Sequence, residues 1–129
     1  MARAALTDVL SPAQRDRRGL GAFNVIQLEH AEAIVAGAEA AGRPTVLQVS
    51  ENAVRYHGAL APVGRAMLAV ADAAAVPVVV HLDHATDLDL VAEALALGFT
   101  SVMFDGSTLP VEDNPVSYTH LTLPTILRV

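Results

Sequence analysis

The segment His81-Leu-Asp-His84 carries the residue types best able to do chemistry in this chain. Three valines precede it at 78–80, so burial continues up to His81 and the charge of Asp83 needs a partner. If the strand ends here, the His84 side chain can turn toward the carboxyl end of the strand and bind a metal, while Asp83 beside it transfers protons. This arrangement suits a reaction that passes through an enolate. If the strand continues, His81 and Asp83 share one face and His84 points away. A hydrogen-bonded strand end without catalysis is the alternative that spacing leaves open.

The elements that must position this segment follow a regular alternation. The sequence predicts strands at residues 21–26, 45–49, 76–82 and 99–104, with helices at 27–41, 60–75 and 86–98 between them. Gly42 and Gly98 are placed to end two of these helices, and Thr86 to open the last one with a capping box. An additional helix is predicted at 2–10, ended by Ser11-Pro12, and loops at 13–19 and 50–58.

Strands that alternate with helices predict an α/β fold with parallel strands and right-handed crossovers. The first and third strands read as buried, the third because its apolar run does not alternate. A doubly wound sheet and a (β/α)8 barrel both fit this rhythm, and periodicity alone does not separate them.

In either architecture, the functional residues lie at the carboxyl ends of the strands. Each predicted strand delivers polar groups there, at Asn24, at Gln48 and Ser50, at His81 to His84, and at Asp105 to Ser107. Asp105-Gly is also a common turn pair, and Ser50 could equally cap a helix. A lone Arg55 in the loop is weak support for a phosphate site.

Composition excludes several classes of function. A formal net charge of -6 makes a general nucleic-acid binder a poor candidate, because such proteins need a basic face. The absence of cysteine leaves only His, Asp and Glu as metal ligands. No signal peptide or apolar stretch long enough to span a bilayer is recognisable, so we expect no membrane partner and a cytoplasmic location.

Four motifs together resemble those of class II, zinc-dependent fructose-bisphosphate aldolases and related ketose-bisphosphate aldolases. They are Gly21-Ala-Phe-Asn-Val25, Leu47-Gln-Val-Ser50, His81-Leu-Asp-His-Ala85 and the run from Gly98 to Ser107, in this order and at this spacing. Each motif alone is weakly specific, whereas their combination is highly specific. The resemblance extends to Asn114 and implies a (β/α)8 TIM barrel, here truncated to about its first four β/α units.

The resemblance implies roles for particular residues. Asp83 matches the catalytic acid/base, which exchanges a proton with the C4 hydroxyl of the sugar. His84 matches a ligand of the catalytic Zn2+, and Asp105 a ligand of a second, more buried divalent-metal position. Asn24 and Ser50 match substrate contacts. In this family zinc polarises the ketone of the dihydroxyacetone-phosphate half, and fructose 1,6-bisphosphate is cleaved reversibly to dihydroxyacetone phosphate and glyceraldehyde 3-phosphate, a step of glycolysis and gluconeogenesis.

The segment at 115–129 lacks the alanine-rich composition of the preceding sequence, and it matches none of the family's motifs. One DNA string that encodes Pro115 to Thr125 resembles a transposon-end sequencing adapter. We therefore expect residues 1–114 to be the N-terminal half of an aldolase barrel and 115–129 to be a translated adapter, with further zinc-binding residues and the phosphate-binding loops encoded downstream. A genuine stop codon after Val129 in the genome would refute this expectation.

Three functional interpretations remain open at this point. The full-length parent is expected to act on a sugar bisphosphate and triose phosphates, and to form a homo-oligomer. A sibling activity, such as tagatose-bisphosphate or another ketose-bisphosphate aldolase, fits nearly as well. The 129-residue chain itself is expected to be catalytically inactive and to self-associate, because a half-barrel leaves strand edges unpaired.

Overall fold

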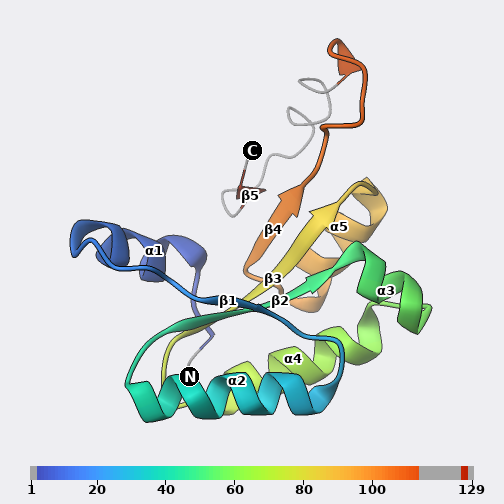
Figure 1. Ribbon diagram of the computed structural model, residues 1–129. Coiled ribbons are helices and arrows are strands. Elements are labelled where there is room, and N and C mark those ends of the chain that lie inside the picture. Colours follow the sequence, from blue (N-terminus) through green and yellow to red (C-terminus); the bar gives the residue numbers. More distant parts are fainter. Residues whose placement is uncertain (1–2, 114–125, 128–129) are drawn as a thin grey trace.

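The computed structural model describes residues 3–113 and 126–127, and within them five parallel strands form one sheet (Figure 1). The strands are β1 (Ala22–Asn24), β2 (Thr45–Ser50), β3 (Val78–Ala85), β4 (Ser101–Phe104) and β5 (Ile126–Leu127). Their order across the sheet is the order in the chain. The helices are α1 (Leu6–Arg15), α2 (Leu28–Ala41), α3 (Glu51–His57), α4 (Ala61–Ala73) and α5 (Leu88–Leu97). None of these helices is long and apolar enough to cross a membrane.

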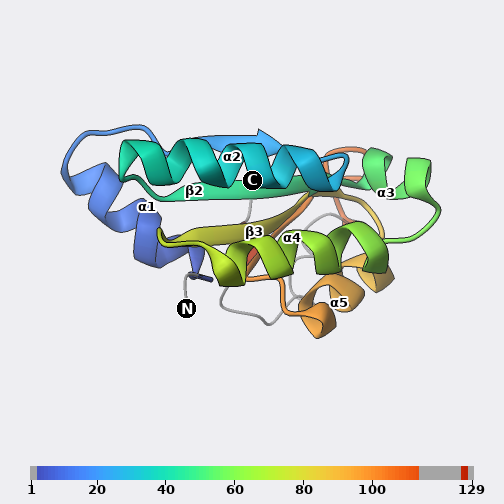
Figure 2. The same ribbon diagram turned by 90° about the horizontal axis from the view of Figure 1, so that it is seen from below.

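The order of the strands distinguishes the two architectures that the sequence left open. A doubly wound sheet reverses its strand order and carries helices on both faces. Here the order never reverses, and α2, α4 and α5 pack on the same face of the sheet (Figure 2). This is the arrangement of successive units in a β/α barrel. Closure into eight strands stays a prediction.

The main core lies between the sheet and these helices. Alternate strand residues face the helices, among them Leu47 in β2 and Val80 in β3. Their neighbours Val46 and Val79 face the other side, where they pack against Leu6 and Val9 of α1. Both faces of β2 and β3 are therefore covered near their amino ends, which explains the unbroken apolar run of the third strand.

The N-terminal helix differs from its prediction, since it begins at Leu6 and continues through Pro12 to Arg15. Proline removes one backbone donor, but Leu6, Val9 and Ala13 recur at helical spacing and are buried. Beyond the proline, the Asp16 N–H still donates to the Pro12 carbonyl at 3.0 Å. Burial of one continuous face outweighs the missing hydrogen bond.

The first strand was predicted to be buried over 21–26, and this is wrong. Only Ala22–Asn24 is a strand, and all three residues are exposed. Within the part of the chain that the structure describes, β1 pairs with β2 alone, so it is an edge strand. Val25, just beyond it, does enter the core and is 1% exposed.

Two helix starts also differ from the sequence predictions. The predicted loop at 50–58 contains α3, whose N-cap Ser50 accepts from the Ala53 N–H at 3.2 Å. Helix α5 is capped by Asp87 through the Asp89 N–H, not by Thr86. The predicted ends at Gly42 and Gly98 are confirmed, since both glycines are left-handed C-caps.

Candidate active site at the carboxyl ends of the strands

A row of polar side chains crosses the sheet on the face opposite α2, α4 and α5. The strand register pairs Asn24 with Gln48, Gln48 with His81 and His81 with Ser101. Gln48 Nε2 donates to Asn24 Oδ1 at 2.8 Å, and His81 Nδ1 lies 2.7 Å from Ser101 Oγ. These four strands therefore place one polar residue each at the same level.

The next level along the strands holds the candidate catalytic residues. Ser50 is the register partner of Asp83. Asp83 Oδ1 lies 4.0 Å from His84 Nε2, and His84 Nδ1 lies 3.1 Å from Asp105 Oδ2. Residues predicted from three different strand ends thus meet in one place.

A local irregularity in β3 brings His84 there. The strand continues to Ala85, but its register with β4 shifts between Leu82 and Ala85. At this bulge His84 has a positive φ of 50°, which is uncommon for a residue other than glycine. Simple alternation would turn His84 away from Asp83, whereas the bulge puts its ring beside both acidic groups.

The charges of the cluster are set by these contacts. Hydrogen bonds from the Ser107 hydroxyl and backbone N–H, with a smaller contribution from His84, lower the pKa of Asp105 to about 2. The hydrogen bond with Asp105 and the nearby Asp83 raise the pKa of His84. Burial lowers the pKa of His81, against the opposing influence of Asp83. An anionic Asp105 therefore faces an exposed imidazole that is easily protonated, while the deeper imidazole favours its neutral form.

The two predicted metal ligands supply only part of a metal site. An imidazole nitrogen and a carboxylate oxygen are suitable donors for zinc, but a catalytic zinc site normally uses three protein ligands. In residues 3–113 and 126–127 no group of three or more His, Cys, Asp or Glu side chains is arranged to hold a metal. His84 and Asp105 are hydrogen-bonded to each other. The described residues therefore do not complete a zinc site by themselves.

The two predicted substrate contacts make protein contacts in this structure. The Asn24 side chain is bound to Gln48, and the Ser50 hydroxyl caps α3. Both lie on the face of Asp83, with Ser50 adjacent to it and Asn24 further away. Arg55 is bonded to Asn52 and Glu51 within its own helix.

Two residues near the cluster were not singled out from the sequence. Ser101 begins β4, and Asp105 directly follows the end of that strand four positions later, so the alternation of side chains along a strand could have placed both on one face. The other is Glu51, whose side chain is only 9% exposed and binds Thr86 just beyond the bulge. No local pattern signals that contact, because 35 positions separate the two residues.

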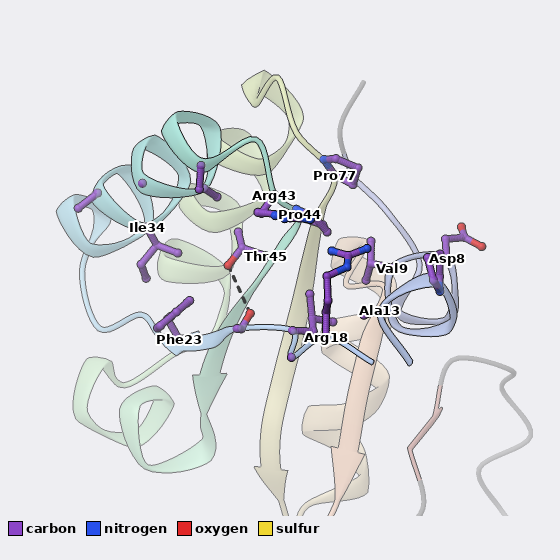
Figure 3. A pocket seen from close by; sticks show the side chains of 18 residues that line it. Asp8, Val9, Ala13, Arg18, Phe23, Ile34, Arg43, Pro44, Thr45 and Pro77 are labelled. Carbon is purple, nitrogen blue, oxygen red and sulfur yellow. Dashed lines mark hydrogen bonds between the residues drawn. The ribbon is translucent and has the colours of Figure 1, made fainter. Parts of the chain in front are cut away.

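A cavity lies at the other end of the sheet, away from Asp83, His84 and Asp105. It encloses about 710 Å3 and is lined by residues that precede β2 and β3, including Pro44 and Pro77. Figure 3 shows Ile34 and Phe23 on one side of it and Val9 on the other. Its mainly apolar lining contains none of the predicted catalytic or metal-binding residues.

Comparison with known proteins agrees with the motifs. Residues 4–122 match the family "Fructose-bisphosphate aldolase class-II". The matched range ends within the segment predicted to be a translated adapter, whose residues 115–125 and 128–129 lie outside the described part. The adapter origin stays a prediction.

Individual relatives extend the comparison. A 6-phospho-5-dehydro-2-deoxy-D-gluconate aldolase of Shouchella clausii is 38% identical over 111 residues, covering 84% of this chain and 38% of that protein. A fructose-bisphosphate aldolase of Thermus caldophilus is 41% identical over 107 residues, covering 83% of this chain and 34% of that protein. The chain thus spans well under half the length of these relatives.

Solved structures agree on the fold. A putative fructose-1,6-biphosphate aldolase from Coccidioides immitis superposes with a TM-score of 0.80 at 30% identity, covering 90% of this chain and 45% of that one. The YdjI aldolase from Escherichia coli K12 superposes with a TM-score of 0.81 at 22% identity, covering 97% of this chain and 51% of that one. The chain belongs to the class II fructose-bisphosphate aldolase family.

Proposed function

We propose that the protein to which this chain contributes is a zinc-dependent aldolase that cleaves fructose 1,6-bisphosphate reversibly into dihydroxyacetone phosphate and glyceraldehyde 3-phosphate. The observation that carries the proposal is the adjacency of Asp83, His84 and Asp105 across the ends of β3 and β4, with separations of 4.0 and 3.1 Å. An acid/base next to candidate metal ligands is what enediolate chemistry requires.

Asp83 is proposed as the group that moves the proton. In the cleavage direction its carboxylate accepts the C4 hydroxyl proton while the bond between C3 and C4 breaks, and the electron pair remains on the three-carbon half as an enediolate. Its side chain is 17% exposed, so it is reachable yet partly shielded from water. In the condensation direction the same carboxyl returns the proton to the new C4 oxygen.

Zinc is proposed as the cofactor, with His84 as one ligand and Asp105 as a ligand of a second divalent-metal position. When bound, zinc supplies a Lewis acid for the ketone oxygen. The remaining ligands must come from outside the described residues, since these hold no complete site. Removing the metal with EDTA should abolish turnover, and returning zinc should restore it.

Asn24 and Ser50 are proposed as substrate contacts. Ser50 is register-paired with Asp83, so a sugar phosphate positioned for proton transfer lies within reach of its hydroxyl. Binding would then compete with the present partners of these side chains, Gln48 and the backbone of α3.

A second substrate is favoured by one of the relatives. The Shouchella clausii protein, 38% identical, is named for 6-phospho-5-dehydro-2-deoxy-D-gluconate, and that reaction class is also an aldol cleavage. Tagatose bisphosphate and other ketose bisphosphates remain alternatives. Separate coupled assays with fructose 1,6-bisphosphate, tagatose bisphosphate and 6-phospho-5-dehydro-2-deoxy-D-gluconate therefore decide which substrate is used.

The test uses two proteins, the 129-residue chain and a chimera in which residues 1–114 are joined to the corresponding C-terminal part of the Thermus caldophilus aldolase. With zinc, we expect turnover of fructose 1,6-bisphosphate from the chimera and background from the chain alone. Asp83→Asn in the chimera should lower kcat by roughly 100-fold or more, whereas Asp89→Asn, at an exposed position of α5, should not. Unchanged turnover in Asp83→Asn would overturn the proposed role, and turnover by the chain alone would overturn its expected inactivity.

A further inference from the structure

His81 is a buried imidazole to which neither the sequence nor the family resemblance gives a role. Its neighbours Val80 and Leu82 pack in the helix-side core, so His81 faces the opposite side, where its side chain is 7% exposed. Nδ1 lies 2.7 Å from Ser101 Oγ, and Nε2 lies 3.7 Å from Asp83 Oδ1. The ring therefore bridges β4 and the proposed proton-transfer group.

These two neighbours together select one tautomer of the ring. Burial lowers the pKa of His81, so near neutral pH the ring carries a single proton. If that proton were on Nδ1, the lone pair of Nε2 would face the carboxylate of Asp83, which is unfavourable in a buried site. With the proton on Nε2, the N–H dipole faces the carboxylate and Nδ1 accepts from the Ser101 hydroxyl. Ser101 is 0% exposed, so water does not compete for that hydroxyl.

We propose that His81, fixed by Ser101 as the Nε2–H tautomer, is a positioning residue that holds Asp83 Oδ1. The inference rests on the proposed function, because it takes Asp83 as the group that needs positioning. At 3.7 Å the contact is longer than a hydrogen bond, so the attraction is electrostatic at this geometry.

Asp83 is then held from two sides on one oxygen. The ring of His81 approaches Oδ1 from the buried side, and the ring of His84 approaches the same oxygen from the exposed side. The closest approach of both rings is to Oδ1, so Oδ2 is the oxygen that we assign to the proton of a substrate. A neutral donor suits this task, since it orients the carboxylate without adding a full positive charge beside it.

The tautomer is tested directly on the 129-residue chain. Long-range 1H–15N spectra distinguish the two neutral tautomers, because the unprotonated ring nitrogen resonates far downfield of the protonated one. The signals are assigned by their loss in His81→Gln. We expect a predominant Nε2–H form in the unmodified chain, and a mixed population in Ser101→Ala. A predominant Nδ1–H form in the unmodified chain would overturn the inference even if Ser101→Ala failed to fold.

Positioning is tested by the side-chain conformation of Asp83. Three-bond couplings to the carboxyl carbon report its χ1 angle, and we expect one rotamer in the unmodified chain. His81→Ala should average the couplings at Asp83 and leave those of the exposed Asp89 unchanged. His81→Gln, which can place an amide N–H near the position of Nε2, should restore the single rotamer. A single rotamer retained in His81→Ala, with the amide spectrum still that of a folded chain, would show that His81 does not position Asp83.

These readouts need no turnover and no metal, so they separate two kinds of failure. A chimera that is folded but inactive, with the expected tautomer and couplings in the chain, would refute the proposed function alone. An active chimera with the other tautomer, or with couplings insensitive to His81, would refute the positioning role alone.

Discussion

The carboxylate of Glu51 accepts a 2.7 Å hydrogen bond from the hydroxyl of Thr86, which joins the start of α3 to the loop after β3. The same oxygen also accepts from the Thr86 backbone N–H at 3.3 Å and from Arg55 at 3.0 Å. Thr86 follows the bulge at His84 by two positions. A buried carboxylate thus ties down the segment that carries the strained histidine.

Glu51→Gln should loosen that segment. An amide keeps one acceptor but loses the charge that strengthens all three hydrogen bonds, so we expect a loss of about 1–2 kcal/mol in the free energy of unfolding. Urea denaturation measures this loss, and hydrogen exchange at residues 84–87 should become faster. Glu93→Gln, on the exposed surface of α5, is the matched control and should change neither quantity. Equal effects of the two substitutions would show that Glu51 does not restrain the loop.

Two glycines predict opposite responses to alanine. Gly98 ends α5 at a φ of 109°, and an added Cβ would lie 2.5 Å from Arg3 Nη1. Gly98→Ala should therefore destabilise the chain by about 1–3 kcal/mol. Gly37 lies inside α2 with nothing within 4 Å of an added Cβ, so Gly37→Ala should stabilise by about 0.5–1 kcal/mol. Thermal or urea denaturation of the two variants measures both signs, and a destabilised Gly37→Ala would contradict the second.

Local patterns were enough to predict much of the sheet. The unbroken valine run at 78–80 predicted a strand covered on both faces, and the structure covers it with helices on one side and α1 on the other. Gly42 and Gly98 were predicted to end helices because a left-handed residue is needed there, and both have positive φ. These features depend on residues that are close together along the chain, so they can be recognised from the sequence.

Features that depend on distant contacts were not predictable in the same way. The continuation of α1 through Pro12 depends on burial against Val46 and Val79. The exposure of β1 depends on its place at the edge of the sheet, which its apolar residues do not indicate. In both cases tertiary context overrides the local signal.

The candidate site shows the same division. Alternation along a strand placed His81 and Asp83 on one face, and their 3.7 Å separation agrees with it. The bulge that turns His84 toward Asp105 depends on the register with β4, and no residue near His84 signals it. The roles of Asp83, His84 and Asp105 came from the family resemblance and stay predictions.

The two histidines of the cluster should titrate on opposite sides of the ordinary value near 6.5. Burial lowers the pKa of His81 and hydrogen bonding to Asp105 raises that of His84, which NMR titration of each ring measures. His81 binds protons more readily when unfolded, so its contribution to stability is complete above pH about 6.5 and is lost as the pH falls toward its folded pKa. His84 has the opposite sign: its contribution is complete below that pH and is lost as the pH rises through its folded pKa.

Variants separate these opposing effects on stability. In His84→Gln, His81 is the only one of the two cluster histidines that remains. The free energy of unfolding should therefore fall more steeply, as the pH is lowered from 7 to 5, than in the unmodified chain. In His81→Gln the fall should be shallower than in the unmodified chain. Urea denaturation at the two pH values measures both slopes, and the reverse order of slopes would show that the two rings do not differ in this way.

The exposed edge of β1 should drive association of the chain with itself. Phe23 is 51% exposed on a strand that pairs on one side only among the described residues, and such an edge is a template for further pairing. Phe23→Lys places a charge on this edge and should reduce association, as measured by sedimentation velocity at increasing concentration. Tyr56→Lys is the matched control, because Tyr56 is 80% exposed but lies on α3, away from any strand edge. If both substitutions reduced association equally, general surface hydrophobicity rather than the open strand would be the cause.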